Sequence, residues 1–285
     1  MGQTYAGLGA RDPQLAPHRD TILDFRLTSL QQSWTRTEYP PFTREPLPGT
    51  LLQQTVHLAR LENTPASLAS ASTLTLGFFF LLRPGEYVGT PNDALDTLFR
   101  HCDLTLWVGS RALSLSTCPL DDIRASTFAT LTFTRQKNGV RNETIGHGRS
   151  GHPQLCPVLR LVDRVLALRA FNAAPATPLN AYRPTEGAAA LRYIQSRDLT
   201  RRLHAALALH PHPGYTASDV SARSTRAGGA MALLCAGVYA NRRIRMIGRW
   251  RSDELYCHLH VQAQPVMTGL AAAMLQGSSY QLAPG

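Results

Sequence analysis

Lysine is almost absent from this chain of 285 residues. Of its 29 lysine and arginine residues only Lys137 is a lysine, and these face 19 acidic residues. The resulting net charge of +10 favours a polyanionic partner such as nucleic acid. A GC-rich coding sequence would also enrich arginine, so the charge by itself leaves both explanations open.

Cysteine is also scarce, and the sequence has no long apolar run. The five cysteines stand far apart, without the spacing of a disulfide framework or a zinc site. The most apolar run, 74–82, is shorter than the roughly 20 residues that cross a bilayer, and the polar N-terminus does not resemble a signal peptide. We therefore expect a soluble, intracellular protein with no membrane partner.

The first 48 residues contain little that predicts regular structure. Prolines recur through them and the apolar residues follow no helical or strand period, so we expect an irregular leader over 1–48. A single folded domain should occupy 49–285. Its first two helices are predicted at 51–61 and 67–82, the second closed by Arg83 and the proline after it.

The spacing of apolar residues changes after residue 100. Alternation predicts four strands that should form a small antiparallel sheet: 104–108, 113–115, 128–136 and 140–146. Asn138-Gly139 predicts a tight turn between the last two. Helical spacing then returns at 158–168, 196–209, 217–223, 227–236, 240–248, 252–260 and 263–276, with an Ala/Pro-rich linker at 172–190. The predicted fold class is α+β, mostly α, with a small antiparallel sheet.

Four places along the chain carry residues suited to phosphate chemistry. Arg83 stands in Leu-Leu-Arg-Pro-Gly-Glu-Tyr, Lys137 adjoins the Asn-Gly turn, Arg223 and Arg226 stand in Arg-Ser-Thr-Arg-Ala-Gly-Gly-Ala, and Gly-Arg-Trp-Arg-Ser-Asp-Glu begins at Gly248. Each has an ordinary explanation when taken alone. An arginine at a helix end favours the helix dipole, a lysine near a turn is solvated, and arginines three apart share a helix face. The paired glycines let another backbone or a ligand come close.

Taken in this order, the motifs resemble those of the tyrosine recombinase, or phage-integrase-type, family. The resemblance runs from about residue 46 to the C-terminus. It is greatest to recombinases of eukaryotic tyrosine-recombinase mobile elements, whose boxes read like Arg-x-Gly-Gly-Ala and Gly-Arg-Trp-x-Ser-Asp. It implies the family's helical catalytic domain with a small sheet, and site-specific DNA recombination or integration. It also implies double-stranded DNA as partner, a homotetramer on DNA, no metal or small-molecule cofactor, and a nuclear location in a eukaryote.

The resemblance also implies roles for individual residues. In this family a tyrosine attacks a DNA phosphodiester, forming a 3′-phosphotyrosyl link and releasing a 5′-hydroxyl. Arg83 and Arg226 match the two arginines that bind the phosphate oxygens. Lys137 matches the lysine that protonates the leaving oxygen, a task for which arginine holds its proton too tightly. Arg223 occupies the position of a family histidine and supports the phosphate instead.

The third motif departs from the family at the nucleophile. Arg249 or Trp250 fits the family's third-box position, and the family spacing places the tyrosine eight residues after Trp250, where this chain has His258. Tyr256 comes two residues early, which on a helix is a rotation of about 200°. Tyr256 would therefore serve only if its helix shifts, and attack by His258 would give a phosphohistidine. The nucleophile stays open between these two residues.

Two other interpretations stand beside an active recombinase. A catalytically dead DNA-binding remnant of a mobile element would keep the basic residues without the chemistry. A type IB topoisomerase would share the chemistry but not the mobile-element motifs. The family's N-terminal DNA-binding domain would be truncated here, because only the leader precedes the catalytic region.

Two further segments complete the expectations. If the chain assembles as the family does, the segment from Val261 to Leu275 would dock on a neighbouring copy. His-x-His pairs at residues 210 and 258 have no carboxylate or cysteine at metal-ligand spacing. We therefore predict no metal site.

Overall fold

The computed structural model describes residues 45–89, 97–134, 142–185, 188, 190–236, 247–249 and 269–279. By internal contacts the chain divides into Met1–Thr43 and Arg44–Gly285, and every described residue lies in the second unit. Part of the predicted leader belongs to this unit, since Leu47 is fully buried and its N–H donates to the Ser224 carbonyl at 3.0 Å.

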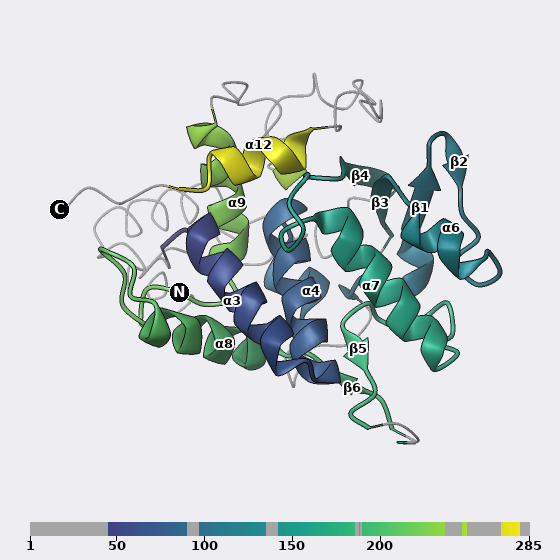
Figure 1. Ribbon diagram of the computed structural model, residues 1–285, viewed down its shortest axis with the longest axis horizontal. Coiled ribbons are helices and arrows are strands. Elements are labelled where there is room, and N and C mark those ends of the chain that lie inside the picture. The colour runs from purple at the N-terminus through teal and green to yellow at the C-terminus, as the bar shows by residue number, and fades with distance from the viewer. Residues whose placement is uncertain are drawn as a thin grey trace, which may run out of the picture. The chain divides into compact units, whose positions relative to one another are not determined.

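The described chain combines helices with short antiparallel strands (Figure 1). The helices are α3 (Gly49–Glu62), α4 (Pro65–Phe79), α5 (Pro84–Tyr87), α6 (Leu120–Arg124), α7 (Pro157–Ala170), α8 (Ser196–Leu209), α9 (Ser224–Cys235) and α12 (Leu270–Gln276). A 3-10 helix spans His101–Asp103, and the strands are β1 (Leu104–Val108), β2 (Arg111–Ala112), β3 (Phe128–Phe133), β4 (Glu143–Gly148), β5 (Ala181–Tyr182) and β6 (Arg192–Tyr193). The predicted class, helices with a small antiparallel sheet, is confirmed. None of the described helices is long and apolar enough to cross a membrane.

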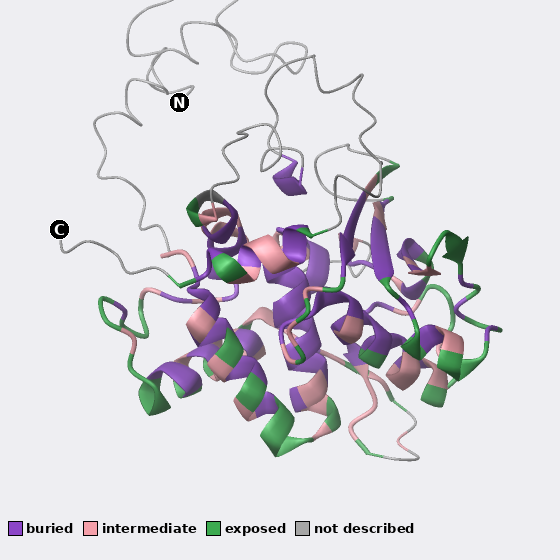
Figure 2. Ribbon diagram, turned by 45° about the horizontal axis from the view of Figure 1, so that its top comes forward, coloured by how far each residue is buried: buried purple, intermediate pink, exposed green. Residues whose placement is uncertain are grey.

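Helix α4 is buried along nearly its whole length (Figure 2). A reciprocal cap fixes its start: the Ser67 N–H donates to Thr64 Oγ1 at 3.1 Å, and the Thr64 N–H donates to Ser67 Oγ at 2.9 Å. Buried hydroxyls within the helix donate to carbonyls one turn earlier, as Thr73 does to Ala69 at 2.7 Å. Because these polar groups are satisfied inside the helix, apolar neighbours can surround it.

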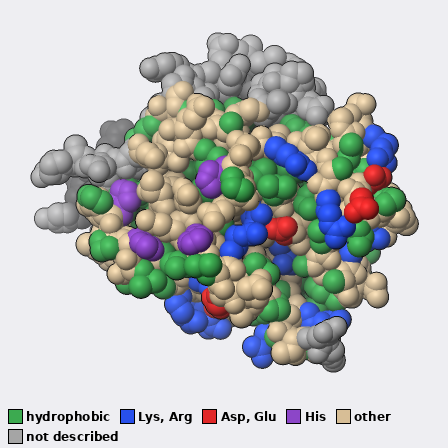
Figure 3. Space-filling view, viewed as in Figure 1, with side chains coloured by type: hydrophobic (Ala, Val, Ile, Leu, Met, Phe, Trp, Pro, Cys, Tyr) green, Lys and Arg blue, Asp and Glu red, His purple; other side chains and the backbone are tan. Residues whose placement is uncertain are grey.

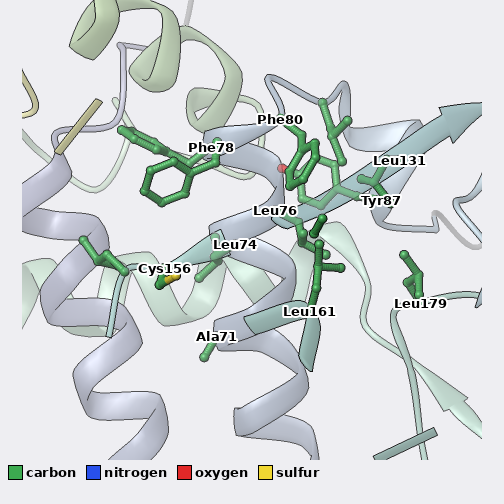
Figure 4. Packing of buried hydrophobic residues seen from close by; sticks show 14 of the residues in the cluster. Ala71, Leu74, Leu76, Phe78, Phe80, Tyr87, Leu131, Cys156, Leu161 and Leu179 are labelled. Atoms are coloured by element: carbon green, nitrogen blue, oxygen red, sulfur yellow. The ribbon is translucent and has the colours of Figure 1, made fainter. Parts of the chain in front are cut away.

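Amphipathic helices surround α4. Helices α3, α7 and α9 pack on it, and α8 packs mainly on α3. Figure 4 shows Leu74, Leu76 and Phe80 in the middle of the resulting core, near Leu161 of α7 and Leu131 of β3. Each fully buried leucine contributes roughly 1.5–3 kcal/mol through removal of apolar surface from water. The core therefore joins the helices to the sheet.

The main sheet has the strand order β2-β1-β3-β4 and is antiparallel throughout. It lies beside α7, which contacts β3 and β4 (Figure 1). The last hairpin is predicted at 128–136 and 140–146, and its described ladder ends at the pair Phe133 and Glu143. Residues 135–141, with the predicted turn, lie outside the described residues.

The segment before α9 differs from the prediction. The apolar spacing predicts a helix at 217–223, but this is wrong, because the segment forms turns. The backbone N–H and the hydroxyl of Thr216 each donate to the Asp219 carboxylate at 2.6 Å. Such local side-chain bonds compete with helical ones. Helix α9 then begins at Ser224, three residues before its predicted start.

The predicted linker at 172–190 contains regular structure. Strand β5 lies within it and pairs with β6. Buried Arg164 fastens this region to α7, since its guanidinium donates to the carbonyls of Leu179 and Ala181. The predicted helix at 252–260 lies outside the described residues, as do most of 240–248 and the first part of 263–276.

Candidate functional site

Arg83 lies at the junction between α4 and α5. Helix α4 ends at Phe79, Leu81 adopts a φ of 48°, and Arg83 is the extended N-cap residue of α5. Arg83 therefore begins the next helix. The prediction that it closes the apolar helix is wrong, because α4 already ends at Phe79. The Arg83 N–H donates to Glu86 Oε2 at 2.7 Å, which anchors its backbone and leaves the side chain half-exposed.

Glu86 is a buried carboxylate between two arginines. Its Oε1 lies 3.7 Å from Arg83 Nη1, and its Oε2 lies 2.6 Å from Arg249 Nη2. A buried carboxylate is stable only when such partners compensate for lost hydration. Glu86 therefore fixes the two guanidinium groups relative to each other.

Arg249 is held on two sides. Its guanidinium lies over the Phe133 ring, 3.8 Å from the centroid, while Glu86 binds one edge. The stack on the aromatic face adds a cation–π attraction. Burial lowers the pKa of Arg249, the carboxylate of Glu86 opposes this, and Arg83 lowers it further. Arg249 is only 8% exposed, so little of it is available to a ligand in this conformation.

Arg226 completes the group from the first turn of α9. Its guanidinium donates to the carbonyl of Gly248, next to Arg249. Burial lowers the pKa of Arg226 to about 10, and repulsion from Arg83 and Arg249 adds to the effect. The side chain still carries its charge at neutral pH.

We call Arg83, Glu86, Arg226 and Arg249 the arginine cluster. Three segments far apart in the sequence supply it, and its three guanidinium groups and one carboxylate leave a net charge of +2. Planar guanidinium groups match the oxygens of a phosphate bidentately. The cluster is therefore suited to bind a phosphodiester. The half-exposed Arg83 is its accessible donor, while Arg226 is part-buried and adds positive charge behind it.

Buried polar contacts fix α5 against the start of α9. The Tyr87 hydroxyl donates to the Ala222 carbonyl at 2.6 Å and lies 2.8 Å from Thr225 Oγ1. Burial raises the pKa of Tyr87, so it remains a neutral donor. This connection sets the position of Arg83 relative to Arg226.

The paired glycines of α9 permit close packing, as their sequence predicts. A Cβ on Gly228 would lie 2.2 Å from the Leu47 carbonyl oxygen, and one on Gly229 would lie 2.1 Å from that of Phe78. The neighbours that approach are thus backbone groups of this chain. The glycines bring α9, and Arg226 with it, directly against α4.

The last described residues of the β3–β4 hairpin lie beside the arginine cluster. Phe133 and Glu143 form the last described pair of its ladder, and both act on Arg249: the ring stacks under the guanidinium, and the carboxylate attracts it. Lys137 comes four residues after Phe133 and lies outside the described residues.

Of the remaining predicted site residues only Arg223 is described, and it forms no hydrogen bond or ion pair with the described residues of the cluster. Arg223 lies just before α9, exposed, so it does not share a helical face with Arg226 as its spacing predicts. Trp250, Tyr256 and His258 lie outside the described residues. Within the described ranges no group of three or more His, Cys, Asp or Glu side chains is placed to hold a metal ion.

Three contributors to the site were not singled out from the sequence. Glu86 and Tyr87 stand in the first motif, and a proline followed two residues later by a carboxylate is a recognisable helix-start signal. Phe133 carries no such signal, because only the tertiary fold places its ring beneath Arg249.

No protein-family model matches this chain, and no curated protein shows significant similarity to it. The charge distribution on the surface does not indicate a function by itself either. On the face in Figure 3, Lys and Arg side chains lie in separate groups, some beside Asp or Glu, rather than in one continuous basic stripe. The functional argument therefore depends on the arginine cluster.

Proposed function

We propose that the chain is a tyrosine-recombinase-type catalytic domain that binds double-stranded DNA and cleaves and rejoins its strands in site-specific recombination or integration. The observation that carries this proposal is the convergence of Arg83, Arg226 and Arg249 on Glu86. In the sequence these arginines belong to three separate motifs that resemble the boxes of that family. Their meeting at one place, beside the root of the Lys137 hairpin, is what a shared phosphate site requires.

The proposed reaction follows from the charges in the cluster. Attack on phosphorus places negative charge on the non-bridging oxygens, and Arg83 and Arg226 would neutralise it. The bond from phosphorus to the 5′-oxygen breaks, a protein–phosphate bond forms at the 3′ side, and Lys137 gives its proton to the leaving oxygen. Reversal by another 5′-hydroxyl rejoins the strand. The bond energy is retained, so no nucleotide is consumed.

Arg249 takes a different part in this proposal. Its guanidinium is occupied by Glu86 and Phe133, so we assign it to positioning the cluster rather than to direct phosphate contact. Arg223 and Trp250 remain candidates for additional contacts with the DNA backbone.

A second candidate is a DNA-binding remnant that no longer cleaves. The observation that favours it is His258 at the position where the family spacing places the tyrosine. Tyr256 would have to reach the phosphate from a different helical position. The cluster would still bind DNA in this case.

A nicked duplex that traps covalent intermediates distinguishes the two candidates. The proteins compared are wild type, Tyr256→Phe, His258→Tyr and Arg226→Ala, and the readout is a protein–DNA band that survives denaturation. A wild-type band lost in Tyr256→Phe identifies Tyr256 as the nucleophile. A band found only in His258→Tyr means an intact phosphate site without its attacking oxygen.

Two controls complete the experiment. Arg226→Ala should abolish any band, because phosphate charge would no longer be neutralised. Duplex binding by wild type is measured by fluorescence anisotropy in parallel. Binding without a band in any variant supports the remnant, and absence of both binding and bands contradicts the proposal.

A further inference from the structure

Helix α8 borders a groove on the surface of the described chain. Its volume is about 560 Å³. The groove is lined by Gly89, Gln195, Ser196, Arg197, Thr200 and Arg201, with His204 at one end. We call it the α8 groove.

The groove carries positive charge that the described residues do not neutralise. Arg197 and Arg201 are exposed, one helical turn apart, and no described residue forms an ion pair with either. Neighbouring Arg202 differs, since its Nη1 lies 2.6 Å from Glu62 Oε2. The nearby carboxylate of Asp198 is engaged by the Gln195 N–H at 3.0 Å.

The start of α8 adds donors to the same groove. Ser196 and Arg197 are its first residues, and the first N–H groups of a helix have no partner within the helix. Together with the helix dipole, such groups favour an anion.

Hydrogen bonds connect the groove to the segments that carry the arginine cluster. The Ala222 N–H donates to Thr200 Oγ1 at 3.3 Å, and the Ala222 carbonyl accepts from Tyr87 at 2.6 Å. Gly89, two residues after Tyr87, pairs with Gln195. The groove and the cluster are therefore built on the two ends of α5 and on the segment that leads into α9.

We propose that the α8 groove is a second phosphate subsite, which binds the DNA backbone away from the phosphate that is cleaved. Arg197 and Arg201 supply the charge, while the first N–H groups of α8 supply further donors. This inference rests on the proposed DNA-cleaving function, because the backbone of a bound duplex is the polyanion that would extend from one site to the other. A lone phosphate would gain nothing from the connection between the groove and the arginine cluster.

The test measures duplex binding by fluorescence anisotropy over a series of salt concentrations. The variant is Arg197→Gln with Arg201→Gln, and the matched control is Arg111→Gln on β2, whose side chain is exposed and pairs with Asp122. Loss of two phosphate contacts should weaken binding roughly tenfold and lower the slope of log affinity against log salt by about two. Arg111→Gln should change neither by a comparable amount.

Every other outcome overturns the groove proposal, and one of them overturns the proposed function as well. If Arg226→Ala weakens binding while the double variant leaves affinity and slope unchanged, the groove proposal fails and the proposed function stands. An equal loss in Arg111→Gln indicates a general charge effect and overturns the groove. If wild type does not bind duplex DNA, both proposals fail. Circular dichroism of the variants should match wild type, since both substituted side chains are exposed.

Discussion

Arg249 and Glu86 form an ion pair of 2.6 Å between two side chains that are each almost fully buried. Removing one member of a buried pair leaves the other charge without compensation. We therefore expect Glu86→Gln to lower the free energy of unfolding by about 3 kcal/mol, measured by urea denaturation.

The control for this prediction is an exposed ion pair. Arg111 and Asp122 lie 3.0 Å apart with solvent-accessible side chains, and such pairs contribute less than about 1 kcal/mol. Asp122→Asn should therefore change stability little. A Glu86→Gln protein as stable as Asp122→Asn would show that the cluster does not depend on its carboxylate.

Buried His147 predicts a stability that depends on pH. It lies on β4 against the Phe79 and Phe80 rings, and burial lowers the pKa of His147 to about 4, an effect that the Phe79 backbone partly offsets. In the unfolded chain the imidazole has its usual pKa of 6.5. The unfolded state thus binds the proton more readily, and stability is lost as pH falls from about 6.5 to 4.

The size of this loss should be roughly 3 kcal/mol. Urea denaturation of wild type and His147→Leu at several pH values isolates it, because the substitution removes this titration and leaves the others. The variant should show a flatter dependence whatever its absolute stability. Parallel curves for the two proteins would mean that His147 does not remain neutral in the fold.

Gly228→Ala tests the contact between α9 and the chain before α3. The added Cβ would lie 2.2 Å from the carbonyl oxygen of Leu47, and overpacking of this kind costs about 1–3 kcal/mol despite the better helix propensity of alanine. Gly85→Ala is the matched control, since nothing lies within 4 Å of its added Cβ. Thermal unfolding should give a lower melting temperature for Gly228→Ala than for Gly85→Ala, and equal melting temperatures would contradict the packing described.

Helix α12 packs on α9 of the same chain, with Ala271 and Met274 fully buried. Truncating Met274 to alanine should lower the free energy of unfolding by about 2–5 kcal/mol. Gln276→Ala, at an exposed position of the same helix, should have little effect. Urea denaturation of both variants checks this expectation. Equal free energies of unfolding would mean that α12 does not pack on the core.

The same helix refines the predicted docking segment. Deleting residues 262–285 should abolish assembly on DNA if Val261 to Leu275 docks on a neighbouring copy. Because α12 contributes to the core of its own chain, that deletion would also destabilise the protein. Assembly on DNA, measured by sedimentation, should therefore be compared with the denaturation curve of the truncated chain, which shows whether it is still folded. Unchanged assembly would rule out the docking role.

The sequence predicts most elements where one periodic pattern extends over several turns. Helix α8 has its predicted bounds because its apolar face is continuous. The predicted helix at 217–223 fails because Thr216 and Asp219 bond locally, a competition that apolar spacing does not report. Short elements such as α5 also escape prediction, since four residues form little more than one turn and cannot show a repeating pattern.

Within the site, motif order predicts which residues meet but not how. Arg83, Arg226 and Arg249 belong together in the structure, as their motifs predict. The sequence does not reveal that Arg249 is occupied by Phe133 and Glu86, because those contacts join segments more than a hundred residues apart. The motifs thus indicate that the three arginines meet, but not which other side chains surround them.

The arginine cluster couples the stability of the fold to the binding of an anion. Three like charges are held close together with one carboxylate between them, so part of their mutual repulsion remains, and a bound anion would relieve it further. The protein without DNA should thus be less stable than its packing alone would make it. If the proposed function holds, DNA would stabilise the folded domain as a ligand as well as serve as its substrate, and the bound form would be the more stable of the two.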